Sequence, residues 1–196
     1  ILGTYGDNIT QSIAIAKDGR IAVSTGDGIA IFDSDTGEFT PFADRRVDDL
    51  AFAPDGSLWA TSWPDRGAIM RFDGNGVGEL LTDIPAAIDS IAFGAAGSEF
   101  EGLALFTSSE GSGISRLFAM DMASLQTVTI AAGQVRAEGI ASLSDGRIVV
   151  AHSTGLDVIR PLKAPDVVAT SLATGAIVTA PVSTLSFKFD DEMTTE

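Results

Sequence analysis

Three Asp-Gly pairs, each set between two runs of apolar residues, are the feature of this 196-residue chain that most limits its fold. They are Asp18-Gly19 in "AKDGRIAV", the pair in "APDGSLW" at residues 53–59, and Asp145-Gly146 in "LSDGRIVV". An Asp-Gly pair in this setting is a strong signal for a tight turn between two antiparallel strands. The sequence therefore predicts that the same β-hairpin is built more than once.

The segments around these turns align with one another in four units. First strands are expected at "QSIAIAK" from Gln11, "DDLAFAP" from Asp48, "DSIAFGA" from Asp89 and "EGIASLS" from Glu138. Second strands follow as "RIAVST", "SLWATS", "GLALFTS" and "RIVVAHS", and third strands as "GIAIFD", "AIMRFD", "ISRLFAMD" and "LDVIRP". The third unit replaces the Asp-Gly turn with the longer "AAGSEFEG", residues 95–102. Short runs rich in Ile, Val and Phe, separated by Gly, Asp, Ser or Pro, are typical of β-strands.

A fourth strand completes three of the units, as "GEFTPF", "GELLTD" and "QTVTIA". Matching Ile21, Leu58, Leu103 and Ile148 gives spacings of 37, 45 and 45 residues. A period of about 40 residues with four strands per unit is the signature of β-propeller blades. The predicted fold is all-β: a propeller of about four blades over residues 1–162, followed by a short β tail.

The fourth unit has only three strands, because Pro161 and the following "KAP" segment end the pattern. Residues 1–6, "ILGTYG", are predicted to supply its fourth strand and so to close the ring. The alternative is that the four blades are part of a larger ring, cut at its N-terminus. The chain starts at Ile1 with no basic, apolar leader, so we expect a processed protein or a fragment.

Residues 163–196 break the period and are predicted to be a linker with a partial immunoglobulin-like (Ig-like) segment. This tail resembles the opening of a bacterial Ig-like domain at Pro165, Val167, Val168, Gly175, Phe189, Asp190, Asp191, Glu192 and Met193. The resemblance implies neighbouring Ig-like domains in the parent chain. Two strands cannot bury the core of a sandwich that needs seven, so we expect an extended arm, a hairpin packed on the propeller, or part of a larger domain.

Composition excludes several classes of partner. The chain has 27 acidic and 12 basic residues, a net charge of −15, which repels nucleic acid and anionic membrane surfaces. It contains no cysteine, so disulfides and thiolate chemistry are absent. No apolar run reaches the roughly 18 residues of a membrane-spanning helix. The acidity favours solubility, in keeping with a secreted or cell-surface protein.

The propeller segment, on the strength of "FAPDGSLWATS" and "AEGIASLSDGRIVVAHS", resembles the group of NHL-type, streptogramin-lyase-like and gluconolactonase-like propellers. The resemblance covers residues 10–160. It implies the fold but not an activity, because propellers with this hairpin include enzymes, sensors and adhesins.

The position that opens each first strand holds Gln11, Asp48, Asp89 and Glu138. First strands of a propeller line its central channel, so these side chains are predicted to form a polar ring at one mouth of it. The three carboxylates are candidate Ca²⁺ ligands, and Gln11 is a candidate ligand contact. The gluconolactonase-like resemblance implies a metal-binding role for Glu138, which is followed by Gly139. The alternative is that these side chains bond loop amides or solvate the channel rim.

Four other sites have residue types that occur in functional sites. The segment "DSDTGE", Asp33 to Glu38, is predicted to be a turn rather than a calcium loop, because most ligands of such a loop are missing. His152, the single histidine, and its neighbour Ser153 are expected to have no catalytic role. Trp59 is predicted to pack between blades. Trp63, before a proline, is a candidate ligand contact on a loop.

No set of nucleophile, base and oxyanion donors can be assembled from the sequence, and no cofactor fingerprint is present. This favours a non-catalytic binding or adhesion scaffold of a secreted or cell-surface bacterial protein, with a protein or glycan ligand. The alternative is a calcium-dependent hydrolase or lyase, of the gluconolactonase or streptogramin-lyase type, acting at the channel mouth. A third hypothesis is an architectural spacer.

Overall fold

The chain forms two compact units, residues 1–161 and 162–196. The computed structural model describes residues 10–64, 67–109, 113–160, 167–171, 184 and 186–189. Within these ranges the regular secondary structure is entirely β-strand. No helix among the described residues has the length and hydrophobicity needed to cross a membrane.

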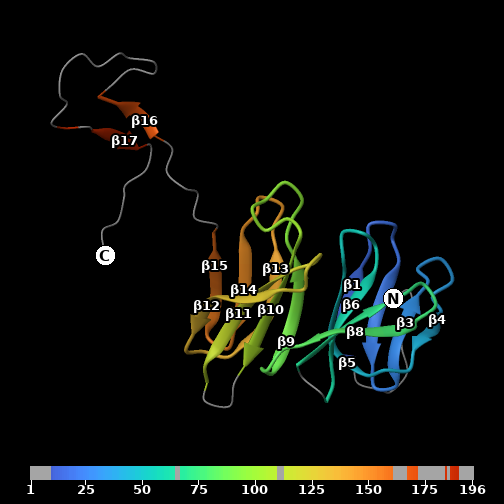
Figure 1. The fold of residues 1–196 in the computed structure, drawn as a ribbon. Coiled ribbons are helices and arrows are strands. Elements are labelled where there is room, and N and C mark those ends of the chain that lie inside the picture. Colours follow the sequence, from blue (N-terminus) through green and yellow to red (C-terminus); the bar gives the residue numbers. More distant parts are fainter. Residues whose placement is uncertain are drawn as a thin grey trace. The chain divides into compact units, whose positions relative to one another are not determined.

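The first unit consists of antiparallel sheets that follow one another along the chain as blades (Figure 1). Blade 1 holds β1 (Ile13–Ile15), β2 (Ile21–Thr25), β3 (Gly28–Phe32) and β4 (Phe39–Ala43). Blade 2 holds β5 (Val47–Phe52), β6 (Leu58–Ser62), β7 (Ala68–Phe72) and β8 (Gly78–Asp83). Blade 3 holds β9 (Ile88–Phe93), β10 (Leu103–Ser109), β11 (Ser115–Asp121) and β12 (Thr127–Gly133). Blade 4 holds β13 (Ala137–Ser142), β14 (Ile148–His152) and β15 (Gly155–Ile159).

Each blade pairs its strands in chain order, which makes it a meander of hairpins. The four sheets are arranged as the blades of a β-propeller, which confirms the predicted fold class. Blade 4 has three described strands, as the sequence predicts. The segment predicted to close the ring, residues 1–6, lies outside the described residues.

The first turn of blades 1, 2 and 4 is the predicted Asp-Gly turn. Gly19, Gly56 and Gly146 have φ angles of +90°, +86° and +84°, a region in which residues with a Cβ are strained. The preceding aspartate accepts hydrogen bonds from the residue two positions on. At Asp55 these come from the Ser57 hydroxyl at 2.6 Å and the Ser57 amide at 2.9 Å, and they lower the pKa of the carboxyl. These aspartates stabilise the turns of the fold.

Residues 33–38 are the turn between β3 and β4, as predicted. The carboxylate of Asp33 accepts hydrogen bonds from the backbone amides of Asp35 at 2.8 Å and Thr36 at 3.1 Å. Asp73 and Asp121 accept backbone amides in the same way at the corresponding turns of blades 2 and 3. The repeated acidic residue of this turn is therefore a backbone cap.

The strand register corrects the sequence alignment in blade 3. Ile15 pairs with Ile21 in blade 1, whereas the corresponding residue of blade 3, Phe93, pairs with Ala104. Ala104, and not Leu103, therefore occupies the position of Ile21. The longer connection at residues 95–102 shifts the second strand by one residue, a shift that the hydrophobic pattern does not reveal.

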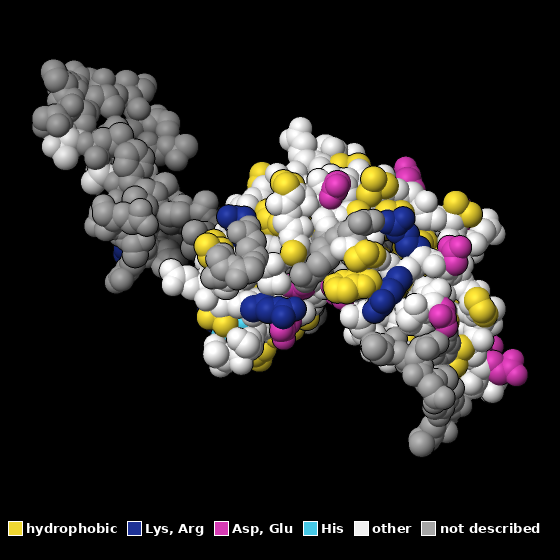
Figure 2. All heavy atoms as spheres, turned by 90° about the horizontal axis from the view of Figure 1, so that it is seen from below, with side chains coloured by type: hydrophobic (Ala, Val, Ile, Leu, Met, Phe, Trp, Pro, Cys, Tyr) yellow, Lys and Arg dark blue, Asp and Glu magenta, His cyan; other side chains and the backbone are white. Residues whose placement is uncertain are grey.

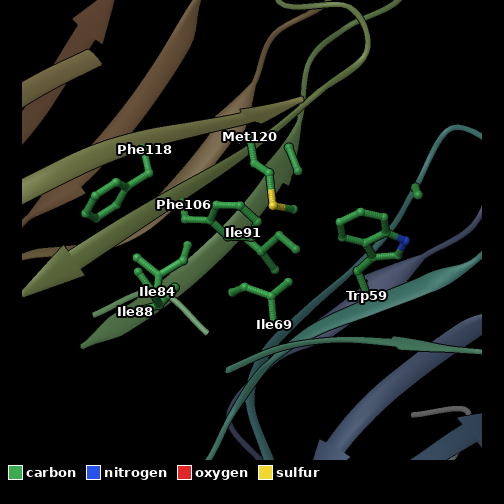
Figure 3. Packing of buried hydrophobic residues seen from close by; sticks show 10 residues of the cluster. Trp59, Ile69, Ile84, Ile88, Ile91, Phe106, Phe118 and Met120 are labelled. Carbon is green, nitrogen blue, oxygen red and sulfur yellow. The ribbon is translucent and has the colours of Figure 1, made fainter. Parts of the chain in front are cut away.

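Hydrophobic clusters fill the spaces between successive blades. The cluster between blades 2 and 3 contains Trp59 and Ile69 from one side and Ile91, Phe106 and Met120 from the other (Figure 3). Trp59 is 2% exposed, and its indole N–H donates to the hydroxyl of Ser57 at 3.0 Å. Its predicted packing between blades is confirmed. Similar clusters lie between blades 1 and 2 and between blades 3 and 4.

The described part of the second unit is a two-stranded antiparallel ladder of β16 (Val167–Thr170) and β17 (Phe187–Phe189). The amide of Ser171 donates to the carbonyl of Ser186 at 3.0 Å beside the ladder. Pro165, Gly175 and residues 190–193 of the predicted Ig-like pattern lie outside the described residues. The Ig-like assignment stays a prediction.

Two glycine substitutions separate backbone strain from steric clash. Gly19 (φ +90°) has open space around the position of a Cβ, whereas a Cβ on Gly76 (φ +79°) would lie 1.7 Å from the Phe42 carbonyl oxygen. We expect Gly19→Ala to lower the free energy of unfolding by about 1 kcal/mol, the cost of the left-handed conformation. Gly76→Ala should lower it by at least about 2 kcal/mol more, because the outer turn of blade 2 must move off blade 1. Urea unfolding monitored by circular dichroism measures both, and equal losses would contradict the described contact.

Candidate functional site at the central channel

The first strands of all four blades, β1, β5, β9 and β13, line one open cavity of about 740 Å³. Strands β5 and β9 contribute the largest parts of its wall, and β1 and β13 complete it. Gln11, Asp48, Asp49, Asp89 and Glu138 are its lining residues with charged or amide side chains. The described lining contains four carboxylates and no lysine or arginine, so the cavity is acidic.

The four residues singled out from the sequence all line this cavity. The side-chain amide of Gln11 donates to Asp48 at 3.1 Å, which joins blades 1 and 2 at the channel mouth. Asp89 is largely buried and accepts a hydrogen bond from the hydroxyl of Ser109. Glu138 forms an ion pair with Arg136 at 3.2 Å. Of the four predicted residues, the hydrogen bonds therefore bring Gln11 and Asp48 together.

The arrangement of these carboxylates bears on the predicted calcium site. In the described part of the chain, no three acidic or histidine side chains lie close enough together to share a metal ion. Ca²⁺ takes six to eight oxygen ligands, so binding here requires Asp48, Asp89 and Glu138 to exchange their present partners for the cation. Calcium binding at these residues stays a prediction.

Sequence reasoning missed the residue that organises the channel wall, Asp49. One carboxylate oxygen of Asp49 accepts the hydroxyl of Ser12 and the amide of Leu50, the latter at 2.9 Å. The other accepts the hydroxyl of Ser90 at 2.6 Å and the amide of Ile91 at 2.9 Å. A single side chain of blade 2 thus bonds to blade 1 on one side and to blade 3 on the other.

The hydrogen bonds continue from Asp49 to the two outer blades. The hydroxyl of Ser90 accepts the amide of Ile140 from blade 4 at 3.2 Å. In blade 1 the amide of Ser12 donates to the hydroxyl of Ser24 at 2.8 Å. We call this chain of bonds through Ser12, Asp49 and Ser90 the inner relay. It links the first strands of all four blades.

The inner relay uses the position directly after the predicted polar ring. That position holds Ser12, Asp49, Ser90 and Gly139, a small or polar residue in every unit. Such a residue inside a strand that is otherwise Ile, Leu or Ala is the signal that identifies the position in the sequence. Gly139 has no side chain, so blade 4 joins the relay through a backbone amide.

The two remaining candidates lie away from the cavity lining. Trp63 is half-buried, and the guanidinium of Arg46 lies 5.5 Å from the centre of its ring. His152, at the end of β14, has its Nε2 3.6 Å from a carboxylate oxygen of Asp157 and its Nδ1 3.0 Å from the hydroxyl of Thr154. The ligand-binding role of Trp63 stays a prediction.

A second cavity borders the other ends of β1, β5 and β9. Ile15, Phe52 and Phe93 form part of its wall, together with the Asp-Gly turns of blades 1 and 2, and its volume is about 740 Å³. Its charged lining residues have both signs, as at Lys17 and Glu101. On the face of the protein drawn in Figure 2, exposed hydrophobic side chains lie among positive and negative ones. The first cavity differs from the second in that its described lining has carboxylates but no lysine or arginine.

Comparison with known proteins shows the fold. No protein-family model and no curated protein matches the chain. The extracellular domain of BT4673 from B. thetaiotaomicron is similar with a TM-score of 0.60 and 16% identity, over 81% of this chain and 22% of that one. YCF48 bound to D1 peptide is similar with a TM-score of 0.63 and 14% identity, over 83% and 54%.

A gluconolactonase from Xanthomonas campestris, XC5397, is similar with a TM-score of 0.60 and 19% identity, over 76% of this chain and 58% of that one. The chain thus spans between about a fifth and three fifths of these three proteins. At such identities the similarity establishes the β-propeller fold alone.

The inner relay predicts a large effect of a small substitution. Asp49→Asn places an amide group opposite two hydrogen-bond donors, so we expect the free energy of unfolding to fall by about 2–4 kcal/mol. Asp48→Asn, the matched control on the adjacent residue, keeps an acceptor for Gln11 and should cost less than about 1 kcal/mol. Urea unfolding of both variants tests this, and equal costs would show that the relay does not hold the blades together.

Proposed function

We propose that this chain is a non-catalytic binding module whose first cavity holds a positively charged segment of a partner protein. The observation that carries the proposal is the composition of the lining: four carboxylates from blades 2, 3 and 4, and no lysine or arginine among the described lining residues. Of these carboxylates, Glu138 pairs with Arg136 at the rim. A concave site lined by one sign of charge concentrates the opposite charge and steers its approach.

The electrostatics favour a cationic ligand over a neutral one. The hydrogen-bond partners of Asp49 among the described residues are neutral hydroxyls and amides, so none of these bonds pairs its carboxylate with a cation. The whole chain carries a net charge of −15, which adds to the attraction. A neutral glycan would gain little from this field, whereas a lysine- or arginine-containing segment would pair with it.

The shape of the site fits an extended segment. The cavity is open and runs along the first strands, from the level of Gln11 to that of Phe52. YCF48, a propeller with a similar fold, is known in complex with a peptide, which supports a peptide ligand at the level of the fold. The single histidine does not line the cavity, which supports binding rather than catalysis.

We further propose that the protein acts outside the cell or at its surface. Similarity to an extracellular propeller domain supports this location. In this proposal the second unit is part of an Ig-like module that joins the propeller to neighbouring domains of a longer surface protein. The hairpin of β16 and β17 is compatible with two strands of such a module.

A binding titration tests the proposed ligand class. The probe is a fluorescent peptide of alternating lysine and alanine, with a glutamine and alanine peptide of equal length as the neutral reference. We expect the lysine peptide to bind, and the double variant Asp48→Asn/Glu138→Gln to bind it about tenfold more weakly, a change of about 1.4 kcal/mol. Fluorescence anisotropy at two salt concentrations measures the affinity and its screening.

The matched control is Asp35→Asn/Glu38→Gln, which removes the same two charges from the exposed outer turn of blade 1. It should leave the affinity within about twofold. Equal weakening by both double variants would reduce the effect to net charge and reject the cavity as the site. Calorimetric titration with Ca²⁺ distinguishes the enzyme hypothesis, because binding heat lost in Glu138→Gln would favour the calcium-dependent hydrolase or lyase.

A further inference from the structure

Blades 1 to 4 follow one another as a row, with blade 1 at one end and blade 4 at the other (Figure 1). The outer faces of these two end blades expose apolar side chains. On blade 1 the face turned away from blade 2 includes Ile13, which is 64% exposed. On blade 4 the face turned away from blade 3 includes Leu156, which is 68% exposed, and the half-exposed Val158. Isolated exposed apolar residues are ordinary on a protein surface, so the positions of these residues in the blade decide their meaning.

On blade 1 the exposed position is one that other blades bury. Ile13 is the third residue of its first-strand motif, and Leu50 and Ile91 hold the same place in blades 2 and 3. Leu50 and Ile91 are each 3% exposed, and both lie in the clusters that pack against the preceding blade. The exposed face of blade 1 therefore corresponds to the face that packs against the preceding blade in blades 2 and 3.

On blade 4 the exposed positions are those that pack on a following blade. By strand pairing, Leu156 corresponds to Leu117 of blade 3, and Val158 corresponds to Ala119. Leu117 is 4% exposed, and both blade 3 residues lie in the cluster shared with blade 4. The exposed face of blade 4 thus has the residues of a blade interface, and no further blade among the described residues packs on it.

Neither face carries charge on these strands, although the chain is strongly acidic. The face of blade 1 takes Ile13, Ile15, Ile21 and Val23 from β1 and β2. The face of blade 4 takes Ala141, Val149, Ala151, Leu156 and Val158 from its three strands. The absence of charged residues from these strand positions favours their burial in an interface over permanent contact with water.

We propose that a second copy of this chain covers both faces and completes an eight-bladed ring. The two faces are complementary. The outer face of blade 4 has the residues that pack on a following blade, and the outer face of blade 1 has the residues that pack on a preceding blade. A second copy supplies both at once: blade 4 of each chain packs on blade 1 of the other, in a closed twofold arrangement. Eight blades lie within the range that propellers adopt.

The interface between blades 2 and 3 provides a template for the contact. There Ile69 of blade 2 and Ile91 of blade 3 lie beside each other in the shared cluster (Figure 3). Leu156 occupies the position of Ile69, and Ile13 that of Ile91. The second copy should therefore bring its Leu156 next to Ile13.

The mass of the protein in solution, measured by sedimentation velocity over a range of concentrations, tests this proposal. We expect a species of twice the 20.2 kDa of the single chain. Ile13→Lys alone and Leu156→Glu alone should each reduce the mass to that of one chain, because each places a charge in both interfaces of the ring. An equimolar mixture of the two variants should recover the doubled mass, because one interface then pairs Lys with Glu and the other is unaltered.

Val77→Lys is the matched control, because Val77 is 66% exposed on an outer turn and should leave the doubled mass unchanged. Recovery in the mixture also shows that both variants fold. A single-chain mass for the unaltered protein at every concentration would overturn the proposal. Open-ended polymers would overturn the closed ring, and a doubled mass insensitive to both variants would place the interface elsewhere.

Discussion

The arrangement of the blades depends on the hydrogen bonds that the carboxylate of Asp49 accepts. The first strand of each blade lies at the edge of its sheet, so some of its backbone amides face the channel without a neighbouring strand. Buried or half-buried amides need an acceptor, and an ionised carboxylate is a strong one. Asp49 accepts the amides of Leu50 and Ile91 and ties Ser12 and Ser90 to the same centre. The relay thereby joins sheets that share no strand pairing.

Hydrophobic packing between blades also holds the blades together, but it is less specific than the hydrogen bonds. Successive blades bury clusters of Ile, Leu, Phe and Met, with Trp59 the largest of the buried side chains. Such clusters stabilise a stack of sheets but tolerate small shifts along it. Hydrogen bonds of the inner relay have fixed directions, so they specify the register in which the first strands meet. The acidic cavity is a consequence of that register, because it sets Asp48, Asp89 and Glu138 around one space.

Much of the fold can be predicted from the sequence, because its signals are local. The Asp-Gly pairs predict turns, and the alternation of Ile and Ala predicts strands. The spacing of the repeated strands predicts blades. The place of Asp48 and its counterparts on the channel follows from the strand that each one opens. The longer connection of blade 3 shifts the strand pairing by one residue at Ala104, and the local sequence pattern does not predict this shift.

The candidate site is less predictable, because its properties arise between blades. The role of Asp49 depends on hydrogen bonds to residues 37 and 41 positions away, which no local pattern encodes. Exposure of Ile13 likewise depends on whether another blade packs on it, since Leu50 has the same sequence context and is buried. In both cases the role of the residue depends on neighbouring blades, so local sequence reasoning does not identify it.

Amide hydrogen exchange, followed by NMR, tests most directly whether the inner relay unites the blades. The amides of Leu50, Ile91 and Ile140 should exchange slowly in the unaltered protein, because each donates to a member of the relay. In Asp49→Asn all three should exchange faster together, while the amide of Ser24, which donates to the Ser12 carbonyl inside blade 1, stays protected. Rapid exchange of the three amides in the unaltered protein, or no change on substitution, would contradict this account.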